Sequence, residues 1–340
     1  MSDGEVLVTG GSGYLASHAI AQLLARGHAV RTTVRSLERE VEVRAMVAQA
    51  GVDPHGLQVL RADLMNEDGW AAAASGVEHV LHVASPFPAG TPRTEDDVIV
   101  PAREGTLRVL RAARAAGVKR VVLTSSFAAI GYGHNGSGPF GEDVWTNVYA
   151  PIGAYIKSKT LAERAAWDYV TGDGVGLELV VLNPSGIFGP VLGRDYAASV
   201  AIVAGLLAGQ PRWLPDVGFG IVDVRDVATL HIVAMTHERA AGQRFIASAG
   251  FVNIRHMART LRDQLGPSAA RVPRHSIPTW LLKSVGTKVP SLAAWTADAG
   301  KRREPATGKA TRVLGWRPRP VEQTIVDTAR SLIALGERDR

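Results

Sequence analysis

Residues 5–16 read EVLVTGGSGYLA, and this stretch decides the fold. The first five residues are a short, mostly apolar run typical of a buried β-strand, and glycines follow it directly. From about Gly13 to Arg26 the apolar side chains recur with helical spacing, and the pattern stops at Gly27. A strand that passes through a glycine turn into a helix is typical of a parallel α/β sheet, which we predict here.

The glycine turn has the composition of a phosphate-binding loop. Gly10 and Gly13 allow a tight turn and the close approach of a pyrophosphate, and the small Ala16 allows the helix to pack on the sheet. The N-terminus of the helix offers free N–H groups to the phosphates. We therefore predict a dinucleotide site to which the turn contributes Thr9, Gly10, Ser12, Gly13, Tyr14 and Leu15.

The end of the second strand indicates which dinucleotide binds. An NAD site usually places Asp or Glu there, about 20 residues after the glycines. The strand VRTTVRS has no acid, the first one downstream is Glu38, and Arg35 stands beside Ser36. A guanidinium group matches a 2′-phosphate, which a carboxylate would repel. The predicted cofactor is NADPH or NADP, and a plain surface position for Arg35 is the alternative.

Two later strand ends carry further candidates for this site. Asp63 and Leu64 follow the third strand, where a carboxylate can accept a hydrogen bond from an adenine amino group. The fourth strand is followed by small residues that leave room for the cofactor, namely Ala84, Ser85 and Pro86. Ordinary turn formation by Asp and Pro is the alternative interpretation of both segments.

Strand-like and helical segments alternate through the first half of the chain. The predicted strands cover residues 29–35, 57–61, 77–83, 120–124 and 177–182, and the predicted helices cover 37–50 and 94–116, the second interrupted at Pro101. Such an alternation requires right-handed crossovers between parallel strands. The predicted fold class is therefore α/β, a doubly wound parallel sheet of the Rossmann type.

The pattern changes after Pro184, where Pro and Gly become frequent. The helices predicted beyond it cover residues 224–236, 254–265 and 321–335. We expect residues 1–184 to form a dinucleotide-binding Rossmann domain. Residues 185–340 are expected to form a smaller, mostly helical substrate-binding lobe, with some elements returning to the first domain.

The composition narrows the classes of function. Of the 340 residues, 46% are hydrophobic and 21% charged, which is ordinary for a globular protein. The absence of cysteine excludes disulfides and thiolate sites, and the scattered histidines predict no metal. The net charge of +6 comes from dispersed arginines, so no nucleic-acid partner is expected. With no secretory signal and no apolar stretch long enough for a bilayer, we expect a cytoplasmic protein without a membrane partner.

Tyr155 and Lys159 stand four residues apart in a helical pattern, so they share one helix face. Hydride delivery to a carbonyl group leaves an alkoxide that must gain a proton, and a phenol can donate it. A lysine ammonium beside the phenol favours the phenolate and lowers a pKa that is otherwise near 10. Ser125 and Ser126 end the fifth strand at the same edge of the sheet, and either can orient the carbonyl oxygen unless both only cap the strand.

Several longer stretches, in the same order along the chain, resemble the extended short-chain dehydrogenase/reductase family. They are VTGGSGYLASHAIAQLLARGHAV, TTVRS, HVASP, VLTSS, YIKSKTLAERAAW, LNPSGIFGP and VLGWRPRP. The most similar subgroup contains dihydroflavonol reductases, cinnamoyl-CoA reductases and microbial NADPH-dependent aldehyde and ketone reductases. The resemblance implies that Ser126, Tyr155 and Lys159 are catalytic. It also implies that the cofactor is contacted by Tyr155, Lys159, Pro184 and Ser185.

Two departures from that family bear on the chemistry. Many members place an Asn in the fourth helix to support a proton relay, and Ala102 stands at the corresponding position. Plant flavonoid reductases carry an Asn shortly after the catalytic serine, whereas residues 127–131 read FAAIG here. An apolar substrate is therefore expected rather than a flavonoid.

Aromatic side chains near these positions are candidates for the substrate pocket, although each is equally suited to the core. They are Phe87, Tyr132, Trp145, Phe188, Trp213 and Phe219. We predict an NADPH-dependent reductase of apolar or aromatic ketones and aldehydes, with Tyr155 as the proton donor. Two alternatives stay open: a nucleotide-sugar epimerase or dehydratase, and a non-catalytic NAD(P)-sensing binding protein.

Overall fold

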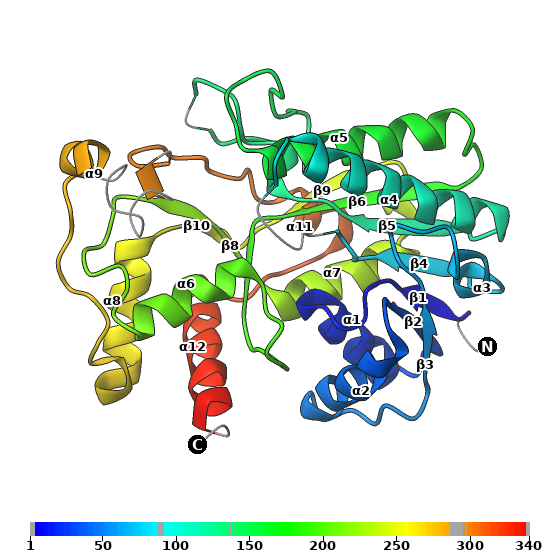
Figure 1. Ribbon diagram of the computed structural model, residues 1–340, viewed down its shortest axis with the longest axis horizontal. Helices are drawn as coiled ribbons and strands as arrows, with labels where there is room; N and C mark the ends of the chain where they lie inside the picture. The colour runs from blue at the N-terminus through cyan, green and yellow to red at the C-terminus, as the bar shows by residue number, and fades with distance from the viewer. Residues whose placement is uncertain (1–3, 87–91, 137, 286–294, 297, 338–340) are drawn as a thin grey trace.

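The computed structural model describes residues 4–86, 92–136, 138–285, 295–296 and 298–337 (Figure 1). Seven strands of these ranges form one parallel sheet: β1 (Val6–Val8), β2 (Val30–Val34), β3 (Leu57–Arg61), β4 (His79–His82), β5 (Arg120–Thr124), β6 (Glu178–Pro184) and β9 (Arg244–Ala247). Their order is β3-β2-β1-β4-β5-β6-β9, so the direction of winding reverses between β1 and β4. The predicted doubly wound parallel α/β fold is confirmed.

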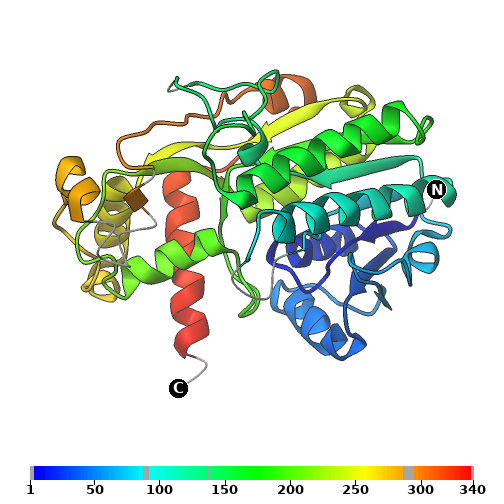
Figure 2. The same cartoon turned by 45° about the horizontal axis from the view of Figure 1, so that its top comes forward.

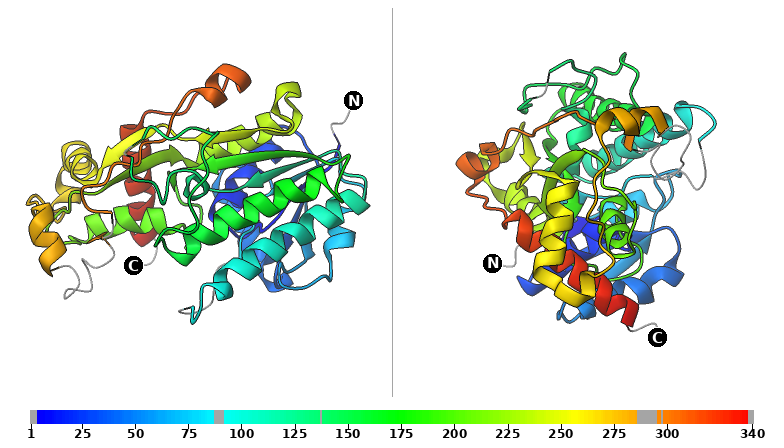
Figure 3. Two further views of the ribbon diagram at one scale, coloured as in Figure 1. Left: turned by 90° about the horizontal axis from the view of Figure 1, so that it is seen from above. Right: turned by 90° about the vertical axis from the view of Figure 1, so that its left-hand side faces the viewer.

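Two layers of helices cover the sheet. One layer contains α1 (Tyr14–Ala25), α2 (Glu40–Gln49) and α7 (Val224–Thr236), and the other contains α3 (Trp70–Ala74), α4 (Asp96–Ala115) and α5 (Ala154–Thr171). Alternate strand residues face opposite layers: Val6 and Val8 pack into the core under α1, and Leu7 packs into the core under α4. Figures 2 and 3 show α4 and α5 side by side on one face. Because both faces are covered, the middle residues of the inner strands are mostly apolar.

A second lobe occupies the other end of the molecule (Figure 1). It contains a sheet of β7 (Gly186–Phe188), β8 (Gly218–Asp223) and β10 (Gly250–Asn253), in the order β10-β8-β7, with the helices α6 (Ala198–Leu207), α8 (Ile254–Leu265) and α12 (Val321–Glu337). Its core includes Phe188 stacked on Phe219, with 5.8 Å between the ring centroids. The predicted C-terminal lobe is therefore helical but also contains a small sheet. No helix within the described residues combines the length and the apolar character needed to cross a membrane.

The other described elements are short: α9 (Thr279–Val285), α11 (Lys309–Leu314), and the 3-10 turns η1 (Leu37–Arg39), η2 (Phe127–Ala129), η3 (Glu238–Ala240) and η4 (Gly266–Ala269). The predicted interruption of a helix at Pro101 is wrong, because α4 continues through that residue. Proline removes only one N–H donor there, the one that would bond the carbonyl of Asp97. Buried side chains on both sides of the proline, Ile99 and Ala102, hold the helix against the sheet.

Arg120 joins the sheet to α7. It stands at the start of β5 and is almost fully buried. Its Nη1 atom donates hydrogen bonds to the carbonyl oxygens of Ala234, Met235 and His237, at 3.0, 3.0 and 2.9 Å, and its guanidinium pairs with Glu178 at 2.7 Å. A cation at a helix C-terminus satisfies carbonyl groups that have no partner within the helix. The contact fixes the end of α7 on the sheet.

Replacing Arg120 by Met should lower the free energy of unfolding by about 3 kcal/mol, because buried carbonyl groups lose their donor. Chemical denaturation checks this value. Arg26→Met is the matched control: Arg26 also donates to a carbonyl at a helix end, that of Gln22, but it is exposed. A loss for Arg120→Met no larger than that of the control would contradict the role given to Arg120.

Candidate functional site

A cavity of about 750 Å³ opens at the carboxyl ends of β1, β2, β4 and β5. This is the switch point of the sheet, where ligands bind in doubly wound folds. Thirteen residues expected at the site line the cavity: Gly10, Ser12, Gly13, Tyr14, Leu15, Arg35, Asp63, Leu64, Ala84, Ser85, Pro86, Tyr155 and Lys159. Thr9, Ser126, Pro184 and Ser185 are not among its lining residues.

The glycine turn has no room for a side chain at Gly10. Gly10 has a φ of +74°, and a Cβ atom there would lie 2.9 Å from the Cβ of Ala84. Gly13 is the N-cap of α1 and gives the helix no side-chain cap. The first N–H groups of α1 are therefore available to a ligand in the cavity.

Thr9 and Tyr14 act at the edges of this turn. The Thr9 hydroxyl contacts His82 Nδ1 at 2.9 Å and accepts a hydrogen bond from the Ala84 N–H at 3.0 Å, so it fixes the segment after β4. Burial lowers the pKa of His82 to about 3, which leaves the ring neutral. The Tyr14 hydroxyl donates to the carbonyl of Gly189 at 2.9 Å and thereby ties α1 to the second lobe.

The adenosine end of a dinucleotide site lies beyond the end of β2. Arg35 is exposed there, lines the cavity and forms no hydrogen bond or ion pair with the described residues. Arg39, which sequence reasoning missed, lines the same cavity and pairs with Glu42 and with Asp195 of the second lobe. Its basic side chain, a few residues beyond the end of β2, is the signal that could have indicated it.

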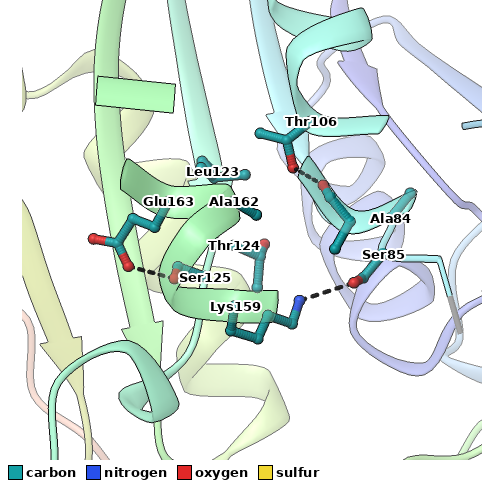
Figure 4. Close-up of a pocket in the computed structure, with 10 residues that line it drawn as sticks. Ala84, Ser85, Thr106, Leu123, Thr124, Ser125, Lys159, Ala162 and Glu163 are labelled. Atoms are coloured by element: carbon teal, nitrogen blue, oxygen red, sulfur yellow. Dashed lines mark hydrogen bonds between the residues drawn. The ribbon is translucent and has the colours of Figure 1, made fainter. Parts of the chain in front are cut away.

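Tyr155 and Lys159 stand one turn apart near the start of α5. Lys159 Nζ donates to Ser85 Oγ at 2.9 Å (Figure 4). The same atom lies 6.0 Å from the centroid of the Tyr155 ring. Burial lowers the pKa of Lys159 to about 8, and the nearby Glu163 carboxylate opposes this shift. Although Tyr155 as a whole is 48% exposed, burial of its hydroxyl raises its pKa, and a hydrogen bond with Ser126 lowers it.

The two serines at the end of β5 have different partners. Ser125 Oγ donates to the Glu163 carboxylate, as Figure 4 shows, so its hydroxyl is already used inside the protein. Ser126 Oγ accepts a hydrogen bond from the Ala128 N–H at 3.1 Å, and its hydroxyl lies near enough to the Tyr155 phenol to lower the pKa of that phenol. The geometry brings Ser126, rather than Ser125, together with the phenol.

Glu163 connects α5 to the strands β6 and β9. It follows Lys159 by one helical turn and is only 1% exposed. Asn183 Nδ2 donates to Glu163 at 2.7 Å and to the carbonyl of Ser126 at 3.1 Å. Arg244 on β9 forms an ion pair with Glu163, with 2.6 Å between Nε and Oε1. Sequence reasoning missed Glu163, although the four-residue spacing after Lys159 places both on one helix face.

Residues 6–248 match the NAD dependent epimerase/dehydratase family. The chain belongs to this family. Tetraketide alpha-pyrone reductase 1 of Arabidopsis thaliana is 36% identical to it over 284 residues, which cover 81% of this chain and 83% of that protein. Cinnamoyl-CoA reductase CAD2 of Medicago truncatula is 36% identical over 250 residues, 70% of this chain and 74% of that protein.

Solved structures extend the likeness over the whole chain. The yeast methylglyoxal/isovaleraldehyde reductase Gre2, solved as a complex with NADPH, has a TM-score of 0.80 and 26% identity, covering 98% of this chain and 99% of that one. The resemblance to the extended short-chain dehydrogenase/reductase family is confirmed. This epimerase/dehydratase family member is an oxidoreductase.

The position at which many family members carry a relay Asn lies beside Lys159. Ala102 lines a small polar space together with Lys159, Ser85, Ser125 and other residues shown in Figure 4. The space has a volume of about 10 Å³, which is close to the minimum for one water molecule. Thr106 Oγ1 donates to the carbonyl of Ala102 at 2.9 Å. Ala102 therefore places a small polar space, and no amide side chain, beside Lys159.

The aromatic candidates for the substrate pocket have separate environments. Burial is the main cause that raises the pKa of Tyr132, with smaller contributions from Asp298 and Tyr155, and Arg303 sits over its ring at 4.5 Å. Trp145 is packed against the guanidinium of Arg244, 3.8 Å from its ring centroid. The other candidates are placed as follows: Phe188 is fully buried in the core against Phe219, Trp213 is half-exposed, and Phe87 lies outside the described residues.

Pro184 and Ser185 lie at the end of β6. Pro184 is buried and pairs with Ala247 of β9, and the Ser185 hydroxyl contacts Ser248 Oγ at 3.1 Å. Asn183, which precedes them on β6, donates a hydrogen bond to the carbonyl of Ser126 and so places both residues near the candidate site. They border the site without lining the large cavity.

Replacing Glu163 by Gln should lower the free energy of unfolding by about 3 kcal/mol, because Arg244 then stays buried without its counter-charge. Denaturation at neutral pH measures the change. Glu322→Gln is the control, since it breaks an exposed pair with His256 and should cost less than about 1 kcal/mol. Adding Arg244→Met to Glu163→Gln should recover part of the loss. If Glu163→Gln and Glu322→Gln lower the free energy of unfolding equally, the buried pair has no special role in stability.

Proposed function

We propose that this protein is an NADPH-dependent carbonyl reductase that transfers hydride to a ketone or aldehyde with an apolar or aromatic body. The observation that carries the proposal is the grouping of Ser126, Tyr155 and Lys159 beside the dinucleotide cavity. Relatives in the family are named as reductases, and Gre2 of yeast and of Candida albicans was solved with NADPH. The cofactor of this protein is NADPH.

The residues of the cavity fit this cofactor. Because Gly10 has no side chain, a pyrophosphate can approach its backbone beside Ala84. The uncapped start of α1 supplies N–H donors for the same group. The exposed guanidinium of Arg35 suits the 2′-phosphate, and Asp63 suits the adenine. When bound, NADPH supplies a hydride to the carbonyl carbon.

The protein's own residues handle the proton. Tyr155 donates its phenolic proton to the carbonyl oxygen, and Ser126 donates a hydrogen bond to the same atom. The ammonium of Lys159 stabilises the phenolate that Tyr155 becomes, and Ser85 keeps that ammonium in place. Burial raises the pKa of Tyr155, so the phenol carries its proton before the reaction.

Charge at the end of β2 favours a reductase over a nucleotide-sugar epimerase or dehydratase. Those enzymes typically hold NAD, and the position where an acid would bind its ribose holds Arg35. A binding protein that only senses the cofactor has no use for Ser126 placed beside the Tyr155 phenol. An apolar substrate body agrees with the FAAIG segment at residues 127–131, which carries no Asn that could bind a substrate hydroxyl.

Replacing Tyr155 by Phe should reduce kcat for carbonyl reduction by about 10²–10⁴-fold, because the proton donor is lost. The assay follows the absorbance of NADPH, and of NADH in parallel, with a panel of aryl ketones, aldehydes and β-keto esters. Tyr149→Phe is the control, since Tyr149 is 95% exposed and should leave the rate unchanged. No consumption of either cofactor with any carbonyl compound would contradict the reductase proposal.

The rate of reduction should fall as the pH rises through about 8, because Lys159 loses its proton there. The carboxylate of Glu163 raises the pKa of Lys159, so Glu163→Gln should move the fall in rate to lower pH. Rates measured from pH 6 to 10 on both proteins check this prediction. A fall in rate that stays at the same pH in the variant, or moves to higher pH, would contradict the proposed action of Glu163 on Lys159.

A further inference from the structure

An ion pair crosses the mouth of the cofactor cavity. Arg39 belongs to η1, next to the nucleotide-binding end of the sheet, and Asp195 belongs to the loop that leads into α6 of the second lobe. Arg39 Nη2 lies 3.0 Å from Asp195 Oδ2, and both residues line the cavity. Figures 1 and 2 both show the loop before α6 reaching toward α1 and α2.

The Nε and Nη2 atoms of Arg39 are both engaged in this arrangement. Glu42 accepts from Nε at 2.8 Å and from Nη2 at 3.0 Å, while Asp195 accepts from Nη2 as well. Arg35, four residues earlier, has no such partner among the described residues. This end of the cavity therefore has two cations, Arg35 and Arg39, that can bind a phosphate, and one carboxylate, that of Asp195, that repels it.

We propose that Asp195 competes with the 2′-phosphate of NADP for Arg39, and so lowers the preference of the enzyme for NADP over NAD. The inference rests on the cofactor assigned under the proposed function. It gives Asp195 a role in cofactor specificity, although the residue comes from the opposite lobe and about 160 residues after the nucleotide-binding strand.

The competition follows from charge. The 2′-phosphate carries more than one negative charge at neutral pH, so it binds Arg39 best when Asp195 has released it. The 2′-hydroxyl of NAD is neutral and gains nothing from that release. Glu42 is not among the residues that line the cavity, so its pair with Arg39 can persist while the phosphate binds. The side chain of Asp195 is 60% exposed, so it can turn into solvent at little cost.

Asp195→Asn should therefore tighten NADPH binding about fivefold at low salt and change NADH binding less than about twofold. Quenching of tryptophan fluorescence during titration with each cofactor measures both Kd values. The Kd for NADPH should fall in the variant, and the gain should shrink at 0.5 M salt, where exposed charges are screened. Because no carbonyl compound is present, a failure of the reductase assay would not alter this result.

Two further variants make the test specific. Asp173→Asn removes an exposed carboxylate beyond the end of α5 and should leave both Kd values unchanged, which controls for net charge. In an Arg39→Gln background the gain from Asp195→Asn should largely disappear. An unchanged or weaker affinity for NADPH in Asp195→Asn, an equal gain for NADH, or a full gain without Arg39 would each overturn the proposal.

Discussion

The carboxylate of Glu163 is the point on which the candidate catalytic group depends. It lies on α5 behind Lys159 and is held by Ser125 at the end of β5, by Asn183 on β6 and by Arg244 on β9. A buried charge is tolerated only when it is compensated in this way, so the contacts act together. They bring the helix with Tyr155 against the strand end with Ser126. The position of the phenol is thus set by residues that do not touch the reacting atoms.

The parallel sheet explains why distant parts of the chain meet at one edge. In such a sheet all carboxyl ends point the same way, and the reversal of winding between β1 and β4 opens a crevice there. The glycine turn after β1, Ser85 after β4 and Ser125 after β5 all reach this crevice from separate crossovers. Polar residues remain acceptable at this edge because the apolar cores lie between the strands and the two helix layers.

Much of the first sheet could be predicted because its signals are local. Apolar runs gave β3 and β5 their bounds, and the spacing of Tyr155 and Lys159 indicated one helix face. Arg39, Glu163 and Asp195 were missed because each acquires its role from partners that are distant in sequence. The break expected at Pro101 was wrong because burial on both sides outweighs one lost hydrogen bond. No local pattern could separate the core aromatic Phe188 from a pocket wall.

The path of the chain limits how this molecule can be divided. After the second lobe begins, the chain returns to add β9 beside β6 and to lay α7 on the layer that contains α1. A fragment ending near residue 184 would keep β6 as an open edge and leave the apolar side of α1 bare, and open edges of this kind pair with other chains. Chimaeras that exchange the second lobe between relatives therefore need two junctions, one on each side of the segment that rejoins the sheet. A single crossover would separate α1 from its partner helix.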